Sequence, residues 1–273
     1  MPSKLIEEYF RTEHLPHIWC PGCGNGIVTR AIVKAIDNLG LKKNDCCIVS
    51  GIGCSSRASG YLDFNTMHTT HGRALAFGTG IKLANPDLNV IVITGDGDAS
   101  AIGGNHLIHA ARRNIDITTV VYNNNTYGMT GGQYSPTTPT GDRGTTAPYG
   151  SIDTTFDLCE LTKAAGATYV SRSTIYNANM ITKQVEEGIN NKGFSFIEAL
   201  TICPTYYGRK NKKGEAVDMI MSLKENSVNV AAYDKLPEEK RRGKFIVGQI
   251  HKSDRPEYTA EYQKIIDSFS KEG

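Results

Sequence analysis

The sequence lacks long apolar runs, an excess of either charge, and any glutamate between Cys20 and Cys159. A transmembrane helix needs a run of about eighteen apolar residues, and the segment from Met1 to Arg11 carries charges where a signal peptide needs an apolar core. We therefore expect a cytoplasmic protein without a membrane partner. Thirty basic and 28 acidic residues give a net charge of +2, which argues against nucleic-acid binding by neutralisation of phosphates. Small ligands are the expected partners.

Alternating strand and helix patterns predict an α/β fold. Apolar residues at helical spacing predict a helix from Ile27 to Leu39, which Gly40 ends. Near-continuous apolar strands then alternate with helices, as in a doubly wound parallel sheet that is covered on both faces. The predicted strands are 47–50, 88–94, 115–122, 168–170 and 194–201, and the further predicted helices are 72–84, 104–113, 155–165 and 178–190.

Two changes of composition divide the chain. Between Gly128 and Gly150 it is rich in Gly, Thr, Pro and Ser, which predicts a long active-site loop. Beyond Gly208 it becomes charged and sparsely apolar, so we divide it into an α/β domain at 1–208 and a C-terminal extension at 209–273. In one interpretation the extension packs on another subunit, and in the other its lysines dock an acidic electron carrier.

The segment Gly95-Asp96-Gly97 directly follows a predicted strand, and Asn123-Asn124-Asn125 directly follows the next one. Carboxylate and amide oxygens suit Mg²⁺, and glycines let backbone N–H groups approach a phosphate closely. Together the two segments resemble the diphosphate-binding signature of thiamine diphosphate (TPP) enzymes. That resemblance implies Mg²⁺ ligation by Asp96, by one of the asparagines, with Asn124 favoured, and by the backbone carbonyl of Thr126.

Four cysteines are expected near this signature. Cys20 and Cys23 form a two-residue-spaced pair, and Cys54 and Cys203 each follow a predicted strand. The carboxyl ends of parallel strands meet at one edge of a sheet, so these thiols should lie beside Asp96. The residues alone leave three interpretations open: a [4Fe–4S] cluster, a zinc site, or buried structural thiols. The remaining cysteines, which fit small apolar core positions best, are Cys46, Cys47 and Cys159.

With the TPP signature, these motifs resemble the β subunit of the 2-oxoacid:ferredoxin oxidoreductases, most closely the 2-oxoglutarate branch (2-oxoglutarate synthase). The motifs are Trp19–Gly24 (WCPGCG), Gly51–Ser56 (GIGCSS), His68–Arg73 (HTTHGR), Gly95–Asp98 (GDGD), Tyr127–Gln133 (YGMTGGQ) and Ser135–Pro139 (SPTTP). The resemblance implies a TPP diphosphate-binding domain in which Cys20, Cys23, Cys54 and Cys203 bind one [4Fe–4S] cluster. It also implies TPP contacts from Ile52, Gly53, Cys54, Ser55, His71, Gly95, Gly97, Asp98, Gly128, Met129 and Thr130, with His71 a candidate catalytic residue.

The family chemistry implied by the resemblance is oxidative decarboxylation of a 2-oxoacid with coenzyme A. Acyl-CoA and CO₂ are formed, and electrons pass through the cluster to ferredoxin. TPP enzymes usually activate the cofactor with a glutamate, and the motif-bearing part of this chain has none. We therefore expect the glutamate from a partner α subunit, with further γ and δ subunits left open.

The substrate is less closely defined by the sequence. The loop segment Thr130-Gly131-Gly132-Gln133 has no cation for a second substrate carboxylate, which leaves Arg73, Arg143 or a partner residue for that role. 2-Oxoglutarate is the expected substrate, with pyruvate and 2-oxoisovalerate as alternatives. Two further alternatives are a non-oxidative TPP-dependent lyase subunit and a non-catalytic zinc-binding regulatory protein.

Overall fold

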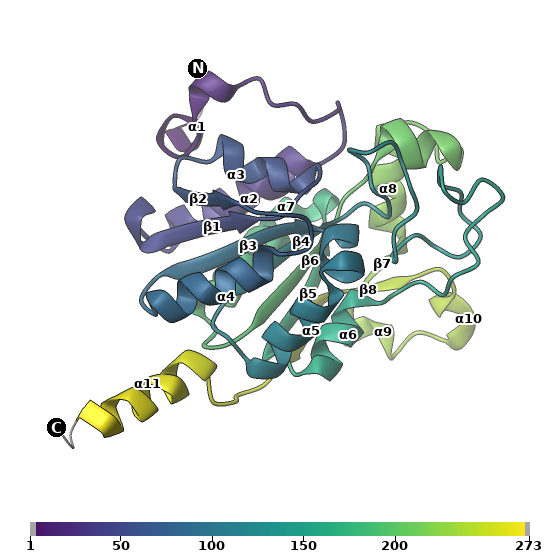
Figure 1. Cartoon of the computed structure of the whole chain (residues 1–273). Coiled ribbons are helices and arrows are strands. Elements are labelled where there is room, and N and C mark those ends of the chain that lie inside the picture. Colours follow the sequence, from purple (N-terminus) through teal and green to yellow (C-terminus); the bar gives the residue numbers. More distant parts are fainter. Residues whose placement is uncertain (1–3, 271–273) are drawn as a thin grey trace.

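One eight-stranded sheet, in the order β2-β1-β3-β4-β6-β5-β8-β7, organises the protein (Figure 1). The computed structural model describes residues 4–270. The strands are β1 Cys46–Ser50, β2 Asn65–His68, β3 Asn89–Gly95, β4 Thr118–Asn123, β5 Tyr169–Thr174, β6 Ser195–Leu200, β7 Ser227–Asn229 and β8 Phe245–Lys252. The six strands from β2 to β5 pair in parallel, whereas β8 pairs antiparallel with β5. The predicted α/β fold with a parallel sheet is confirmed, and β8 is its exception.

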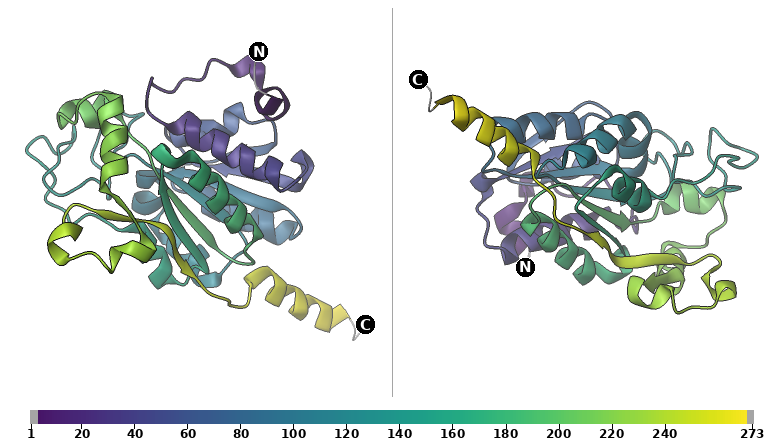
Figure 2. Two further views of the ribbon diagram at one scale, coloured as in Figure 1. Left: turned by 180° about the vertical axis from the view of Figure 1, so that it is seen from behind. Right: turned by 90° about the horizontal axis from the view of Figure 1, so that it is seen from below.

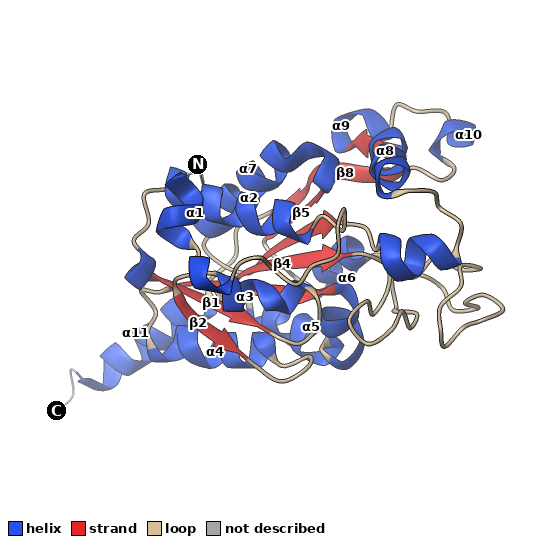
Figure 3. Ribbon diagram, turned by 90° about the horizontal axis from the view of Figure 1, so that it is seen from above, coloured by secondary structure: helices blue, strands red, loops and turns tan. Residues whose placement is uncertain are grey.

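Helices cover both faces of the sheet (Figures 2 and 3). Helices α2 and α7 pack on one face, and α4, α5 and α6 pack on the other. The helices are α1 Lys4–Tyr9, α2 Asn25–Asn38, α3 Ala58–Tyr61, α4 Ala74–Ala84, α5 Gly104–Arg113, α6 Leu158–Ala165, α7 Ala178–Asn190, α8 Ala216–Asn226, α9 Val230–Tyr233, α10 Glu238–Arg241 and α11 Tyr258–Ser270. Between residues 4 and 270, no helix is long and apolar enough to cross a membrane.

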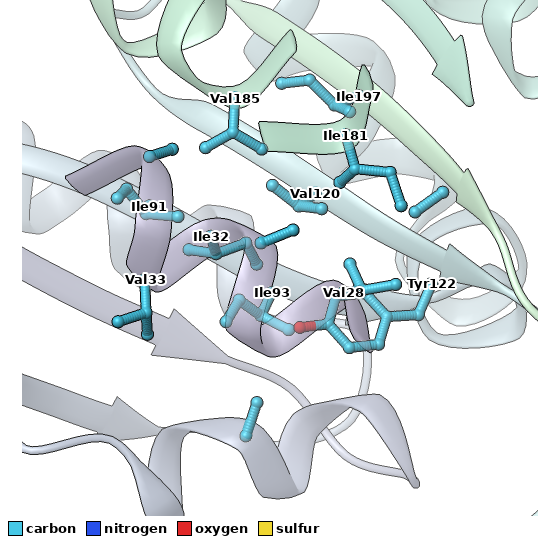
Figure 4. Packing of buried hydrophobic residues seen from close by; sticks show 14 of the residues in the cluster. Val28, Ile32, Val33, Ile91, Ile93, Val120, Tyr122, Ile181, Val185 and Ile197 are labelled. Carbon is cyan, nitrogen blue, oxygen red and sulfur yellow. The ribbon is translucent and has the colours of Figure 1, made fainter. Parts of the chain in front are cut away.

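The core between α2, α7 and the sheet is built from side chains at helical spacing (Figure 4). Val28 and Ile32 lie one turn apart on α2, and Ile181 and Val185 do the same on α7, so each pair faces strand residues such as Val120. Each fully buried aliphatic side chain contributes about 1.5–3 kcal/mol. This packing holds the central strands, and therefore their carboxyl ends, in fixed positions.

The predicted elements differ from the structure mainly outside the central strands. Helix α5 has the predicted bounds, whereas β4 begins three residues after the predicted strand start at Ile115, because Ile115 and Ile117 are core residues of the preceding loop. The predictions missed β2 and everything regular after residue 209, including β8. Strand β8 lies beyond residue 208 yet joins the same sheet, and the predicted division of the chain at residue 208 stays a prediction. Residues 1–3 and 271–273 of the two predicted segments lie outside the described residues.

Candidate active site

The carboxyl ends of four neighbouring strands bring the predicted site residues to one edge of the sheet. Strands β1, β3, β4 and β6 are consecutive in the sheet, and ligands of such folds bind beyond the carboxyl ends of the strands. The segments that follow them are Gly51–Ser55 after β1, Asp96–Asp98 after β3, Asn124–Thr126 after β4 and Cys203 after β6. Two adjacent cavities open at this edge.

The first cavity contains the glycine and asparagine motifs. Its lining residues are Asn25, Ile52–Ser55, His71, Gly95–Asp98, Tyr122, Asn124 and Thr126–Thr130. Every residue proposed for TPP or Mg²⁺ from the sequence is in this set. A side chain at Gly97 would place its Cβ 2.3 Å from the ring of Tyr127, so glycine is required there for close approach of the backbone. Among the described residues no lysine, arginine or glutamate lines the cavity.

Asp96 is the buried carboxylate of this cavity, with 2% of its surface exposed. One of its oxygens, Oδ2, accepts hydrogen bonds from Ser135 Oγ at 2.5 Å and Thr137 Oγ1 at 2.6 Å. Burial raises the pKa of Asp96 to about 6, although both hydroxyls oppose the rise. A divalent cation would offset the burial of this charge and the charge of a diphosphate, since no lysine or arginine of residues 4–270 lines the cavity. The donor set therefore fits Mg²⁺.

The three asparagines after β4 have different surroundings. Asn123 is fully engaged, because its Oδ1 accepts from Thr137 Oγ1 at 3.0 Å and its Nδ2 donates to Glu198 at 2.7 Å. Asn125 lies outside the first cavity, whereas Asn124 lines it. This arrangement supports Asn124 as the Mg²⁺ ligand, with Thr126 next to it in the same cavity.

His71 is held in the first cavity by Asp98. The Asp98 carboxylate is 3% exposed and bonds to Nδ1 of His71, to the backbone N–H of Gly72 at 2.7 Å and to the hydroxyl of Thr94 at 2.7 Å. Asp98 thus fixes the orientation of the imidazole ring. Because Nδ1 is engaged, Nε2 is the ring nitrogen left to meet a ligand.

The second cavity brings the four predicted cysteines together. Cys20, Cys23, Cys54 and Cys203 all line it. Burial raises the pKa of Cys54 to about 12, and the proximity of Cys203, Cys23 and Cys20 adds to the rise, so bound iron would be needed to hold these thiols as thiolates. No group of three His, Cys, Asp or Glu side chains within residues 4–270 is compact enough to hold a single metal ion. A [4Fe–4S] cluster takes four thiolates, one on each iron, and this is the number of thiols that line the cavity.

The two cavities share a wall, and one residue of this wall, Asn25, was not predicted from the sequence to belong to the site. Asn25, Cys54, Asn124, Gly128 and Met129 line both cavities. Asn25 is 2% exposed, and its Oδ1 has no hydrogen-bond partner. An amide oxygen without a protein partner in the wall of both cavities makes Asn25 a candidate acceptor for a bound group. Its place directly after the Cys20–Gly24 motif was the available signal.

The comparisons with known proteins agree with the fold and with the first cavity. The family described as "Thiamine pyrophosphate enzyme, C-terminal TPP binding domain" matches residues 51–199, more than half of the chain. The fold and the site therefore define a TPP-binding domain.

Closer relatives identify the family within this class. The 2-oxoglutarate synthase subunit KorB of Methanocaldococcus jannaschii is 53% identical, over 97% of this chain and 98% of the relative. The subunit of the same name from Methanothermobacter marburgensis is 54% identical, over 92% of this chain and 88% of the relative. A solved structure, the 2-oxoglutarate:ferredoxin oxidoreductase from Magnetococcus marinus with 2-oxoglutarate, coenzyme A and succinyl-CoA bound, is 31% identical with a TM-score of 0.86, covering 97% of this chain and 90% of that one. The chain belongs to the 2-oxoglutarate synthase KorB family, which confirms the resemblance drawn from the motifs.

Proposed function

We propose that this chain is the β subunit of a 2-oxoglutarate:ferredoxin oxidoreductase. The complex would convert 2-oxoglutarate and coenzyme A into succinyl-CoA and CO₂, with release of two electrons and one proton. The observation that carries the proposal is the shared wall between the TPP cavity and the four-thiol cavity. A non-oxidative lyase would have no use for a cluster site next to its cofactor, so the adjacency favours the oxidative reaction.

The residues of the two cavities have separate tasks in this proposal. Asp96, Asn124 and the carbonyl of Thr126 would hold Mg²⁺, and the backbone around Gly97 and Gly128 would approach the diphosphate. Bound TPP supplies a sink for the electron pair that decarboxylation leaves. The four cysteines would hold a [4Fe–4S] cluster that accepts these electrons one at a time before ferredoxin receives them.

A partner subunit must complete the site. No glutamate of the described residues lines the TPP cavity, and Glu198 is tied to Arg172 at 2.6 Å and to Asn123 in the sheet. This supports an α subunit as the source of the activating glutamate. Three large apolar side chains between β4 and α6 are exposed, namely Tyr149 at 97%, Ile152 at 93% and Phe156 at 48%, as expected of a surface that a partner covers.

The choice of 2-oxoglutarate rests on the relatives rather than on a cation in this chain. Neither Arg73 nor Arg143 lines the TPP cavity; Arg73 donates to the carbonyl of Ile102 at 3.1 Å, and the main chain of Arg143 is bonded to Asn211. A partner residue is therefore the better candidate for binding the second carboxylate of the substrate.

The complete complex, purified without oxygen, should show a broad visible absorption that 2-oxoglutarate and coenzyme A bleach together. Electrons from the substrate reduce the cluster, and reduced clusters absorb less. Ferredoxin reduction should be faster with 2-oxoglutarate than with pyruvate or 2-oxoisovalerate. Stopped-flow absorbance and steady-state ferredoxin reduction measure the two effects.

The chain without its partner provides the control for this experiment. It should bind TPP with Mg²⁺ yet show no decarboxylation, because the activating glutamate is missing. Full turnover by the single chain would refute the shared site, and a colourless complex with stoichiometric zinc would refute the oxidoreductase itself.

Replacing Asn25 with leucine should lower activity without lowering stability. Removal of an orphan acceptor leaves the stability equal or raises it, whereas loss of one hydrogen bond to the bound cofactor lowers turnover by about 10- to 100-fold. Urea denaturation and ferredoxin reduction measure the two quantities.

Thr29→Val is the matched control for Asn25→Leu. Thr29 lies on the same helix, is fully buried, and bonds to the carbonyl of Asn25 at 2.9 Å and the hydroxyl of Tyr122 at 3.0 Å. Its replacement should cost about 1 kcal/mol of stability and leave turnover nearly unchanged. If Asn25→Leu behaved like Thr29→Val, Asn25 would be only a structural residue.

A further inference from the structure

A groove of about 460 Å³ lies beside the four-thiol cavity. It is lined by Pro21, Pro204, Thr205, Gly208, Arg209, Lys212, Gly214 and Glu215. It is larger than the TPP cavity, at about 130 Å³, and the thiol cavity, at about 210 Å³. A groove of this size that is open to solvent is better suited to contact with another protein than to binding of a small cofactor.

The groove and the thiol cavity have a common wall. Pro204 and Thr205 line both of them, and Pro204 directly follows the proposed cluster ligand Cys203. Pro21 lies between the ligands Cys20 and Cys23, and Cys20 is exposed. A molecule seated in the groove would therefore lie against the chain segments that hold three of the four thiols.

The groove has positive charge that the protein itself does not neutralise. Arg209 and Lys212 line the groove, and Lys210 lies between them in the sequence. All three are exposed, and none of them forms an ion pair with a carboxylate of the described residues. Lys213 is different, since it pairs with Asp142 at 3.2 Å. The acidic residue of the groove wall, Glu215, forms a capping box at the N-terminus of α8, in which its side chain accepts from the backbone N–H of Asp218.

The basic segment, residues 209–213, is also held in a defined conformation. Asn211, within this segment, donates to the carbonyl of Arg143 at 2.9 Å and to that of Tyr207 at 3.0 Å, and the backbone N–H of Lys213 donates to the carbonyl of Gly208 at 2.9 Å. A surface fixed in this way loses little conformational entropy when a partner binds.

We propose that this groove docks an acidic iron–sulfur electron carrier of the ferredoxin type. The inference rests on the proposed function, because the carrier takes its electrons from the cluster behind Pro204 and Thr205. Complementary charge steers such encounters and sets their rate. Arg209 and Lys212 in the groove, with Lys210 between them in the sequence, supply this charge beside the segments that hold the thiols. Of the two interpretations of the C-terminal extension, the structure thus favours carrier docking for residues 209–213.

The test uses the complete complex with Arg209, Lys210 and Lys212 all replaced by glutamine. With an acidic [4Fe–4S] ferredoxin as acceptor at low ionic strength, the KM for ferredoxin should rise about 10-fold, and its dependence on salt should weaken. With methyl viologen, a small cation that needs no docking surface, 2-oxoglutarate turnover should be unchanged. The single variants Arg209→Gln and Lys212→Gln should each show a smaller part of the effect and serve if the triple variant does not fold.

A matched variant separates docking from a general effect of charge. Lys235, Lys240 and Arg242 are exposed and line neither the groove nor the thiol cavity, so their replacement by glutamine removes the same charge elsewhere. If this control raised the KM for ferredoxin as much, or if the groove variant lost viologen and ferredoxin activity equally, docking in the groove would be refuted while the proposed function stood. Failure of the unaltered complex to reduce viologen would instead refute the proposed function, and the docking inference with it.

Discussion

Asp96→Asn is expected to lower turnover of the complete complex by more than about 100-fold, beyond the 10- to 100-fold typical of residues that only orient metal ligands. Ser135 and Thr137 both donate to Oδ2 of Asp96, so Oδ1, which has no hydroxyl donor within residues 4–270, is the better candidate ligand for Mg²⁺. An amide in its place has no negative charge to hold Mg²⁺, and no lysine or arginine among the described residues lines the cavity to offset a diphosphate instead. Bound TPP and magnesium per chain, measured after gel filtration, should fall together with turnover.

Two variants separate ligation by Asp96 from its orientation. Thr137→Val removes a hydrogen bond to Asp96 and keeps the carboxylate, so turnover should fall by about 10- to 100-fold and excess Mg²⁺ should restore part of it. Asp63→Asn removes a carboxylate that is exposed and paired with Lys43, and it should change neither TPP nor magnesium content. Retention of both cofactors by Asp96→Asn would show that another residue anchors the metal.

The position of the candidate site residues at one edge of the sheet could be predicted, because it depends on the local chain. Asp96 and Asn124 follow buried apolar strands, and the position of a strand end places the next residue at the sheet edge. The helix pattern of α2 placed Cys20 and Cys23 just before a helix that packs on the same sheet. Short-range patterns were therefore enough to bring these groups to one edge.

Other parts of the site depend on contacts that no local pattern encodes. Ser135 and Thr137 reach Asp96 across 39 and 41 residues of sequence, and the polar loop that carries them shows no periodicity. Asn25 looked like an ordinary helix-start residue, since its significance is the absence of a protein partner for Oδ1. Strand β2, Asn65–His68, was missed for a related reason: it is a largely exposed edge strand without apolar alternation.

A buried ion pair on neighbouring strands lies next to the loop that carries Asn124, the proposed Mg²⁺ ligand. Arg172 on β5 lies directly opposite Glu198 on β6, and its Nε donates to Glu198 Oε2 at 2.6 Å. The other oxygen of Glu198 accepts from Asn123 at 2.7 Å, at the start of the loop that presents Asn124. Only 9% of the Arg172 side chain and 3% of the Glu198 side chain are exposed. The pair thus joins the sheet interior to the proposed Mg²⁺ site.

Arg172→Met should destabilise the protein by about 3–5 kcal/mol, because it leaves the buried Glu198 carboxylate without its cation. Glu198→Gln should cost less, since Arg172 keeps Asp157 at 2.6 Å, a carboxylate that is 49% exposed. The double variant Arg172→Met/Glu198→Leu should regain most of the loss, because it leaves no unpaired buried charge. Urea denaturation followed by far-UV circular dichroism gives the free energies of unfolding.

The matched control for this series is Lys163→Met, which breaks an ion pair with Glu160 whose side chains are 42% and 58% exposed. Water and salt screen that pair, so its loss should cost no more than about 1 kcal/mol. The loss of stability should be largest for Arg172→Met, smaller for Glu198→Gln and smallest for Lys163→Met, because the three changes differ in how far they leave a charge both buried and unpaired. Equal losses of stability for Arg172→Met and Lys163→Met would mean that water reaches the Glu198 carboxylate. The hydrogen bond from Asn123 to Glu198 would then not be shielded from water, and it could not fix the start of the loop that carries Asn124.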